Sequence, residues 1–119
     1  MLDIQKSVID GDILVIAMVG RLALGRECQQ VEWTIDELLA AGRPKVVVDL
    51  AALDYMDSTG IGILVTCCGR IEAAGGQMRL AAVNPKIADL LRVTKLSRVI
   101  GIYPTVAEAV ASVSGGPAA

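Results

Sequence analysis

The stretch KVVVDLAALDYMDSTGIGILVTCCGRIEAAGG, residues 45–76, decides which fold the chain is predicted to adopt. Its first six residues, with three successive valines at 46–48, are typical of a strand buried on both faces of a sheet. A loop follows, and a helix is predicted from Ser58, because apolar side chains recur there on one helical face. These are Ile61, Leu64, Val65, Cys68 and Ile71, before Gly75 and Gly76 end the helix. A strand followed by a helix in this way indicates an α/β protein.

The flanking segments extend this pattern in both directions. Strands are predicted over residues 2–8 and 13–19, joined by a turn at Asp10-Gly11-Asp12, with Gly20 ending the second strand. A helix over residues 25–41 is predicted to end at Gly42. Then come a strand over 77–83, a helix capped by Asn84, a strand over 99–102 and a helix opened by Thr105. We therefore expect a mixed β-sheet, with an N-terminal hairpin plus parallel βαβ units, covered by about four helices. Residues 1–113 would form one domain, and residues 114–119 a flexible tail.

Composition excludes several classes of function. The 119 residues are 54% hydrophobic and contain no Phe, so an aliphatic core is expected that needs neither metal nor disulfide. With a net charge of −2, the chain lacks the excess of positive charge that direct nucleic-acid binding requires. No apolar run reaches the roughly 18 residues that span a bilayer, and the N-terminus lacks a signal-peptide pattern, so we expect a cytoplasmic protein without a membrane partner.

The residues that usually hold metals or carry out catalysis are scarce. The chain has no histidine, and Cys28, Cys67 and Cys68 form no metal-binding or redox motif, so buried, reduced thiols and no cofactor are predicted. Without histidine, Ser58 lacks the usual catalytic base. A lysine base would have to come from Lys6, Lys45, Lys86 or Lys95, and nothing places one nearby. We therefore predict that the chain is not an enzyme.

Asp57-Ser58-Thr59-Gly60, at the start of the central helix, permits two interpretations. Asp57 or Ser58 could simply cap the helix, with Gly60 and Gly62 allowing close packing against a neighbour. Alternatively, Ser58 is an exposed hydroxyl that can be phosphorylated, which adds nearly two negative charges at a helix end able to accommodate them. In that case the fold survives while a docked partner is lost, and the two glycines leave room for the partner's backbone.

Several parts of the sequence resemble the signature of STAS domains, above all those of bacterial anti-sigma factor antagonists. They are Val46-Val47-Val48-Asp49-Leu50, Leu53, Met56 to Gly62, Gly75 to Leu80 and Asn84-Pro85. The resemblance implies partner switching: the unphosphorylated protein binds an anti-sigma factor that is itself a serine kinase, and so frees a sigma factor. The kinase, using ATP and magnesium, phosphorylates the serine that matches Ser58, the pair separates, and a serine phosphatase resets the switch.

The expected site follows from this resemblance and from the helix-start chemistry. Ser58 is the predicted phosphorylation site, with Thr59 as the less favoured alternative. The partner surface is expected to comprise Asp54, Met56, Asp57, Ser58, Thr59, Gly60 and Gly62, together with Trp33. One departure is Gly20-Arg21-Leu22-Ala23, since family members often carry aspartate at the position of Ala23. It leaves open a second role in the stress response, as a stressosome-type scaffold subunit phosphorylated in the same loop.

The predicted position of Trp33 needs an explanation. On a helical wheel it lies about 200° from Val31 and Ile35, opposite the core stripe. It could be a lone exposed aromatic side chain, or a contact in a homodimer, with another STAS protein or with another partner. A third class of function, binding of a small molecule such as a nucleotide or lipid, has no supporting feature in the sequence.

Overall fold

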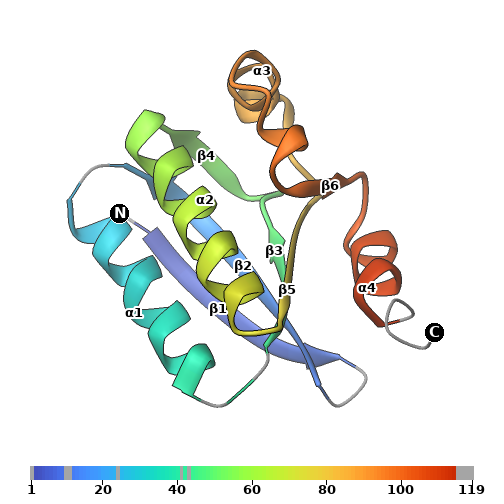
Figure 1. Ribbon diagram of the computed structural model, residues 1–119. Helices are drawn as coiled ribbons and strands as arrows, with labels where there is room; N and C mark the ends of the chain where they lie inside the picture. Colours follow the sequence, from blue (N-terminus) through green and yellow to red (C-terminus); the bar gives the residue numbers. More distant parts are fainter. Residues whose placement is uncertain (1, 10–11, 24, 41, 43, 115–119) are drawn as a thin grey trace.

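The computed structural model describes residues 2–9, 12–23, 25–40, 42 and 44–114. Within them, strands and helices follow one another along the chain as shown in Figure 1. The strands are β1 (Leu2–Ile9), β2 (Ile13–Leu22), β3 (Lys45–Asp49), β4 (Leu53–Met56), β5 (Gln77–Ala81) and β6 (Gly101–Tyr103). The helices are α1 (Arg26–Ala40), α2 (Ser58–Ala73), α3 (Pro85–Val93) and α4 (Val106–Ser114), with a short 3-10 helix, η1, at Leu96–Arg98.

One mixed sheet runs through the molecule in the order β1-β2-β3-β5-β6. The N-terminal hairpin pairs β1 with β2 in antiparallel fashion, and β2–β3, β3–β5 and β5–β6 are parallel. Strand β4 lies off this path, parallel to the C-terminal end of β2, whereas β3 pairs with its N-terminal half. The predicted hairpin, parallel units and four covering helices are confirmed.

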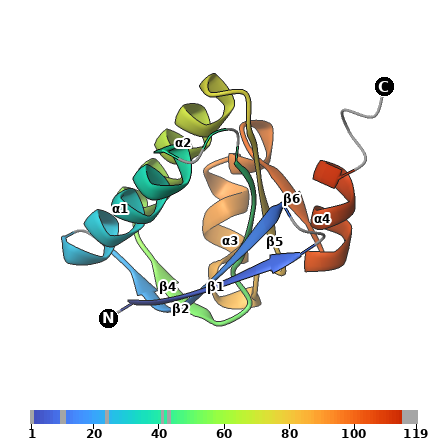
Figure 2. The same ribbon diagram turned by 90° about the horizontal axis from the view of Figure 1, so that it is seen from below.

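Helices cover both faces of the sheet. Helices α1 and α2 lie side by side on one face, and α4 packs on the other, as Figures 1 and 2 show. Side chains of β3 alternate between these layers: Val46 and Val48 belong to the core beneath α1 and α2, and Val47 packs in a separate cluster with Ala109 of α4. Burial on both faces explains why the strand is apolar at successive positions.

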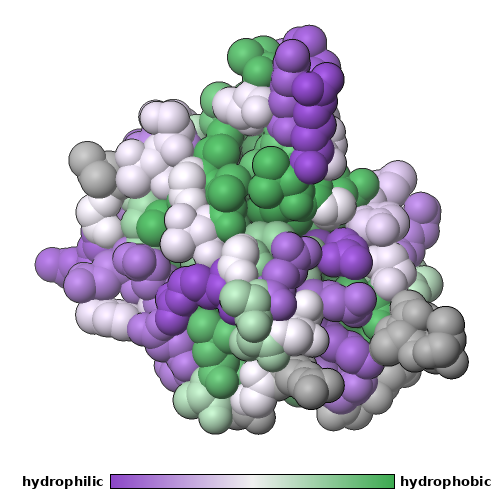
Figure 3. Space-filling view, viewed as in Figure 1, coloured by the Kyte–Doolittle hydropathy of each residue, from purple (hydrophilic) through white to green (hydrophobic). Residues whose placement is uncertain are grey.

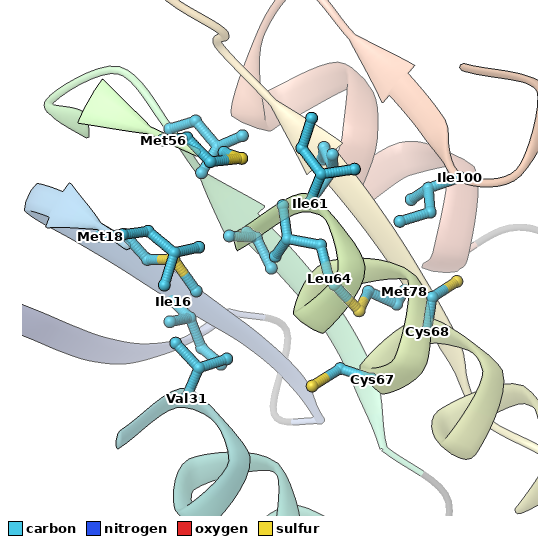
Figure 4. Close-up of a cluster of buried hydrophobic side chains, with 14 of the residues drawn as sticks. Ile16, Met18, Val31, Met56, Ile61, Leu64, Cys67, Cys68, Met78 and Ile100 are labelled. Carbon is cyan, nitrogen blue, oxygen red and sulfur yellow. The ribbon is translucent and has the colours of Figure 1, made fainter. Parts of the chain in front are cut away.

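The core beneath α1 and α2 is aliphatic and sulfur-containing, as predicted. Figure 4 shows Ile16, Val31, Leu64 and Met78 meeting there from strands and helices. Cys28, Cys67 and Cys68 are buried free thiols, which confirms that prediction. Burial raises the pKa of Cys67 to about 11, so this thiol keeps its proton at neutral pH.

Two sequence predictions about the region around the helix start were wrong. Residues 51–57 were expected to be a loop, but Leu53–Met56 form β4, whose four residues are too short to show a clear alternation. Gly20 was expected to end β2, but the strand continues to Leu22. The register between β2 and β4 shifts after Gly20, which has a φ of 108° that other residues rarely adopt, so this glycine bends the strand.

Other element boundaries differ by a few residues. Strand β6 begins at Gly101 and not at residue 99, and β5 ends at Ala81 and not at residue 83. Gly42 follows α1 with a φ of 127°, as expected of a glycine after a helix. The predicted turn at residues 10 and 11 and tail residues 115–119 lie outside the described residues, and Ser114 belongs to α4. None of the described helices combines the length and apolar character needed to cross a membrane.

Candidate functional site: the start of helix α2

Asp57 fixes the junction between β4 and α2. Its backbone is extended, its carboxylate Oδ1 accepts a 2.9 Å hydrogen bond from the Gly60 N–H, and its carbonyl accepts from the Ile61 N–H. Its own N–H donates to the Leu22 carbonyl oxygen at the end of β2. Of the two residues proposed as the cap, Asp57 is therefore the one that caps the helix.

Ser58 is the first residue of α2, and its side chain is exposed. Among the described residues, none forms a hydrogen bond with its hydroxyl. Because Asp57 does the capping, the Ser58 hydroxyl has no structural task there and can be modified without removing a contact of the fold.

Thr59 is half-buried and faces a different environment from Ser58. It lines an open groove with Ile63 of α2 and with Arg26, Gln29 and Glu32 of α1. Of the two residues proposed for phosphorylation, Ser58 is therefore the more exposed.

Two members of the expected partner surface are not on the surface. Met56 is 4% exposed, and Gly60 is buried where a β-carbon would lie 2.7 Å from the Leu22 carbonyl oxygen. Direct contact of these two residues with a partner is thus contradicted, and the close-packing interpretation is correct for Gly60. Gly62 is exposed, and a β-carbon there would meet nothing within 4 Å, so close packing does not explain this glycine.

The outer edge of the site carries charged and aromatic side chains on β4. Asp54 is exposed and forms a 3.1 Å ion pair with Lys86 of α3. Tyr55 is 45% exposed, and the Arg21 guanidinium lies 4.7 Å from the centre of its ring. Sequence reasoning missed this cation–π pair because it depends on the pairing of β2 with β4, and β4 was not predicted.

The space-filling view adds the character of the neighbouring surface. Figure 3 shows hydrophobic side chains gathered between α2 and α3, bordered by hydrophilic ones. Exposed apolar surface rimmed by polar groups is typical of protein–protein contact sites. Trp33 of α1 is 57% exposed, as predicted, but it is not among the residues that line the groove beside Thr59.

The site offers an exposed surface with one free-standing serine hydroxyl, and few groups for chemistry. In the part of the chain that the structure describes, no three His, Cys, Asp or Glu residues gather as metal ligands. Burial raises the pKa of the nearby Cys28 thiol, and the Asp57 carboxylate raises it further, so Cys28 is not a reactive thiolate at neutral pH.

Comparison with known proteins identifies the family. The family model described as the STAS domain matches residues 4–109, and the chain belongs to that family. A Thermotoga maritima protein provisionally named an anti-sigma factor antagonist is 33% identical over 82 residues, which cover 69% of this chain and 73% of that protein. Within the STAS family, the chain is thus of the anti-sigma factor antagonist type, a class of regulatory proteins that are not enzymes.

Solved structures agree with this assignment. A crystal structure of an anti-sigma factor antagonist from Thermotoga maritima, also provisionally named, has a TM-score of 0.84 and 27% identity, covering 93% of this chain and 94% of that one. The anti-sigma factor antagonist SpoIIAA in its unphosphorylated form shares the fold, with a TM-score of 0.79 at 22% identity over 95% of this chain and 97% of that one. SpoIIAA has also been solved in its phosphorylated form.

Proposed function

We propose that this protein is an anti-sigma factor antagonist that regulates transcription by partner switching at Ser58. In its unphosphorylated form it binds an anti-sigma factor that is a serine kinase and thereby frees a sigma factor. When that kinase phosphorylates Ser58, with ATP and magnesium, the complex dissociates. A serine phosphatase then restores the form that binds the kinase. A cytoplasmic location is part of this proposal, since sigma factors act there.

The observation that carries the proposal is the exposed Ser58 hydroxyl at the first position of a helix whose cap is supplied by another residue. A phosphoryl group there brings close to two negative charges next to the Asp57 carboxylate. The helix N-terminus can accommodate this charge, whereas an acidic or apolar surface docked against it cannot. Phosphorylation would therefore change the affinity for a partner and leave the fold intact.

The test measures binding to the cognate anti-sigma factor kinase, to be sought among the products of genes next to the one for this chain. Ser58→Ala is expected to bind like the wild type and to stay bound when ATP and magnesium are added. Ser58→Asp is expected to bind at least about tenfold more weakly, a loss of about 1.4 kcal/mol. Ser97→Asp, which changes an exposed serine of η1, is the matched control and should bind normally.

Two outcomes would contradict the proposal. One is equal affinity of the wild type and Ser58→Asp for the kinase. The other is a phosphate that mass spectrometry finds on Thr59, or elsewhere, in wild-type protein incubated with kinase and ATP. Thr59→Ala should be phosphorylated to the same extent as the wild type.

The alternative role as a stressosome-type scaffold subunit is favoured by one observation, the alanine at position 23. Ala23 is half-buried and its carbonyl oxygen accepts a hydrogen bond from the Cys28 thiol, so it offers a partner no charge. Light scattering separates the two roles. A monomer or dimer supports the antagonist, and a very large assembly formed with other STAS proteins supports the scaffold.

A further inference from the structure

Asn84 uses the two ends of its side chain for different tasks. Its Oδ1 accepts a 2.8 Å hydrogen bond from the Lys86 N–H and so caps α3. Its Nδ2, which has two N–H groups to share, lies within hydrogen-bond distance of three carbonyl oxygens, those of Leu50 and Ala51 just before β4 and that of Leu53 at its start. Capping needs only an oxygen, and Ser, Thr or Asp can supply it. The amide nitrogen therefore serves the β3–β4 segment and not the helix.

These contacts complete the hydrogen bonding of that segment. The remaining carbonyl, that of Ala52, accepts from the Gly20 N–H of β2 at 3.1 Å. Four consecutive carbonyl oxygens thus have donors: Asn84 shares its two N–H groups among three of them, and the Leu50 carbonyl also accepts from the Leu53 N–H at 3.2 Å. Leu50 and Leu53 are buried, so their backbone groups need such partners, and the Asn84 amide serves both of them from outside the segment.

Strand β4 is anchored by the buried side chains of Leu53 and Met56 and by the Asp54–Lys86 ion pair, but it has few backbone hydrogen bonds to the sheet. In the sheet it pairs with β2 alone, over the last residues of that strand. Its end is held by the hydrogen bond from the Asp57 N–H to the Leu22 carbonyl, and its beginning by Asn84 at the Leu53 carbonyl. Ser58 follows directly, so the position of β4 sets the position of the hydroxyl.

We propose that Asn84 is a positioning residue for Ser58, and that it acts through its amide N–H groups and β4, not through its helix cap. The role of Ser58 in this inference rests on the function proposed above. The placement of β4 by Asn84 does not rest on that function, so the two claims can be tested separately.

Asn84→Ser separates the two ends of the side chain, because serine keeps a capping oxygen and loses the amide donors. We expect backbone amides of residues 50–61 to exchange with solvent about tenfold faster, the effect of losing hydrogen bonds that contribute about 1.4 kcal/mol together. Amides of α3 should change less than about twofold. Affinity for the anti-sigma factor kinase should fall about tenfold, with the phosphorylation KM raised and kcat little changed.

The matched control is Thr105→Ala. Thr105 Oγ1 accepts a hydrogen bond from the Glu108 N–H at the start of α4, so this variant loses a helix cap without touching β4. It should lower overall stability by a similar amount and leave both kinase affinity and exchange at residues 50–61 unchanged. If Asn84→Ser acts only by lowering overall stability, the two variants will show the same kinase affinity and the same exchange at residues 50–61. That result would overturn the proposal.

The wild-type protein supplies a measurement that does not depend on a variant folding. NMR should detect couplings across the hydrogen bonds from the Asn84 side-chain amide to carbonyl carbons of residues 50–53, and their absence would also overturn the proposal. If Asn84→Ser accelerates exchange while even the wild type fails to bind the kinase, the positioning role stands and the partner-switching function fails. If the wild type binds and the variant exchanges and binds normally, the positioning role alone fails.

Discussion

Gly60 and Gly62 lie two residues apart in the first turns of α2, and the structure predicts that alanine acts on them in opposite directions. A β-carbon at Gly60 would lie 2.7 Å from the Leu22 carbonyl oxygen and 2.8 Å from Met56 Cγ. The first of these neighbours is backbone and cannot rotate away. At Gly62 a β-carbon would meet nothing within 4 Å.

The magnitudes follow from two competing terms. Replacing glycine by alanine inside a helix favours folding by about 0.8–1 kcal/mol, because alanine loses less backbone freedom. At Gly62 nothing opposes this gain, so the melting temperature should rise by roughly 3 °C. At Gly60, forcing an additional carbon into a packed site typically costs about 1–3 kcal/mol, and a contact with backbone belongs at the upper end. We expect a net loss of about 2 kcal/mol and a melting temperature roughly 8 °C lower.

Urea denaturation followed by circular dichroism measures both variants. The midpoints should move in opposite directions while the slope of the free energy against urea stays constant, since neither change alters the surface exposed on unfolding. A Gly60→Ala variant as stable as the wild type would refute the packing argument. So would a Gly62→Ala variant less stable than the wild type. Because Gly62→Ala should fold well, reduced binding of the kinase by this variant would report directly on the partner surface.

Two further predictions concern other parts of the molecule. The free energy of unfolding should fall as pH rises from about 9 to about 11, because the unfolded Cys67 thiol ionises above its ordinary pKa of 9.0 while the folded thiol keeps its proton up to about 11. Below pH 9 both the folded and the unfolded protein hold the proton, and no effect is expected. Between about pH 9 and about pH 11, urea titrations of Cys67→Ala should show a smaller fall in the free energy of unfolding than the wild type. An equal dependence on pH in the two proteins would contradict the assignment to Cys67. Trp33→Ala should leave stability within about 0.5 kcal/mol, because the side chain is 57% exposed. If light scattering and kinase titration show the same oligomeric state and affinity as the wild type, Trp33 is not a contact residue.

Most of the fold was predictable because it depends on patterns that repeat over many residues. The apolar runs of β2 and β3 and the spaced apolar residues of α2 and α4 show in the sequence which segments are buried and with which period. Asn84 followed by Pro85 marked the start of α3 for a local reason, since a cap and a proline at the first turn need no partner elsewhere.

The error at β4 has the opposite cause. Leu53 and Met56 are buried and the two residues between them are exposed, so no period of two is visible in so short a strand. The strand pairs with β2 where the register shifts after Gly20, and its first residue accepts a hydrogen bond from Asn84, far along the chain. Pairings between distant segments leave no local pattern in the sequence.

Some properties of the candidate site likewise follow from the sequence, and others only from the tertiary structure. That Asp57-Ser58-Thr59-Gly60 starts a helix, and that no histidine is present to make Ser58 a nucleophile, are properties of the residues and their order. Only the folded chain decides that Asp57 is the cap and Ser58 the exposed residue, that Thr59 lines the groove beside α1, and that Gly60 is needed for packing while Gly62 is not. Helix chemistry is local and acts over four residues, whereas exposure and close contact depend on where β2 and α1 lie, and packing alone sets those positions.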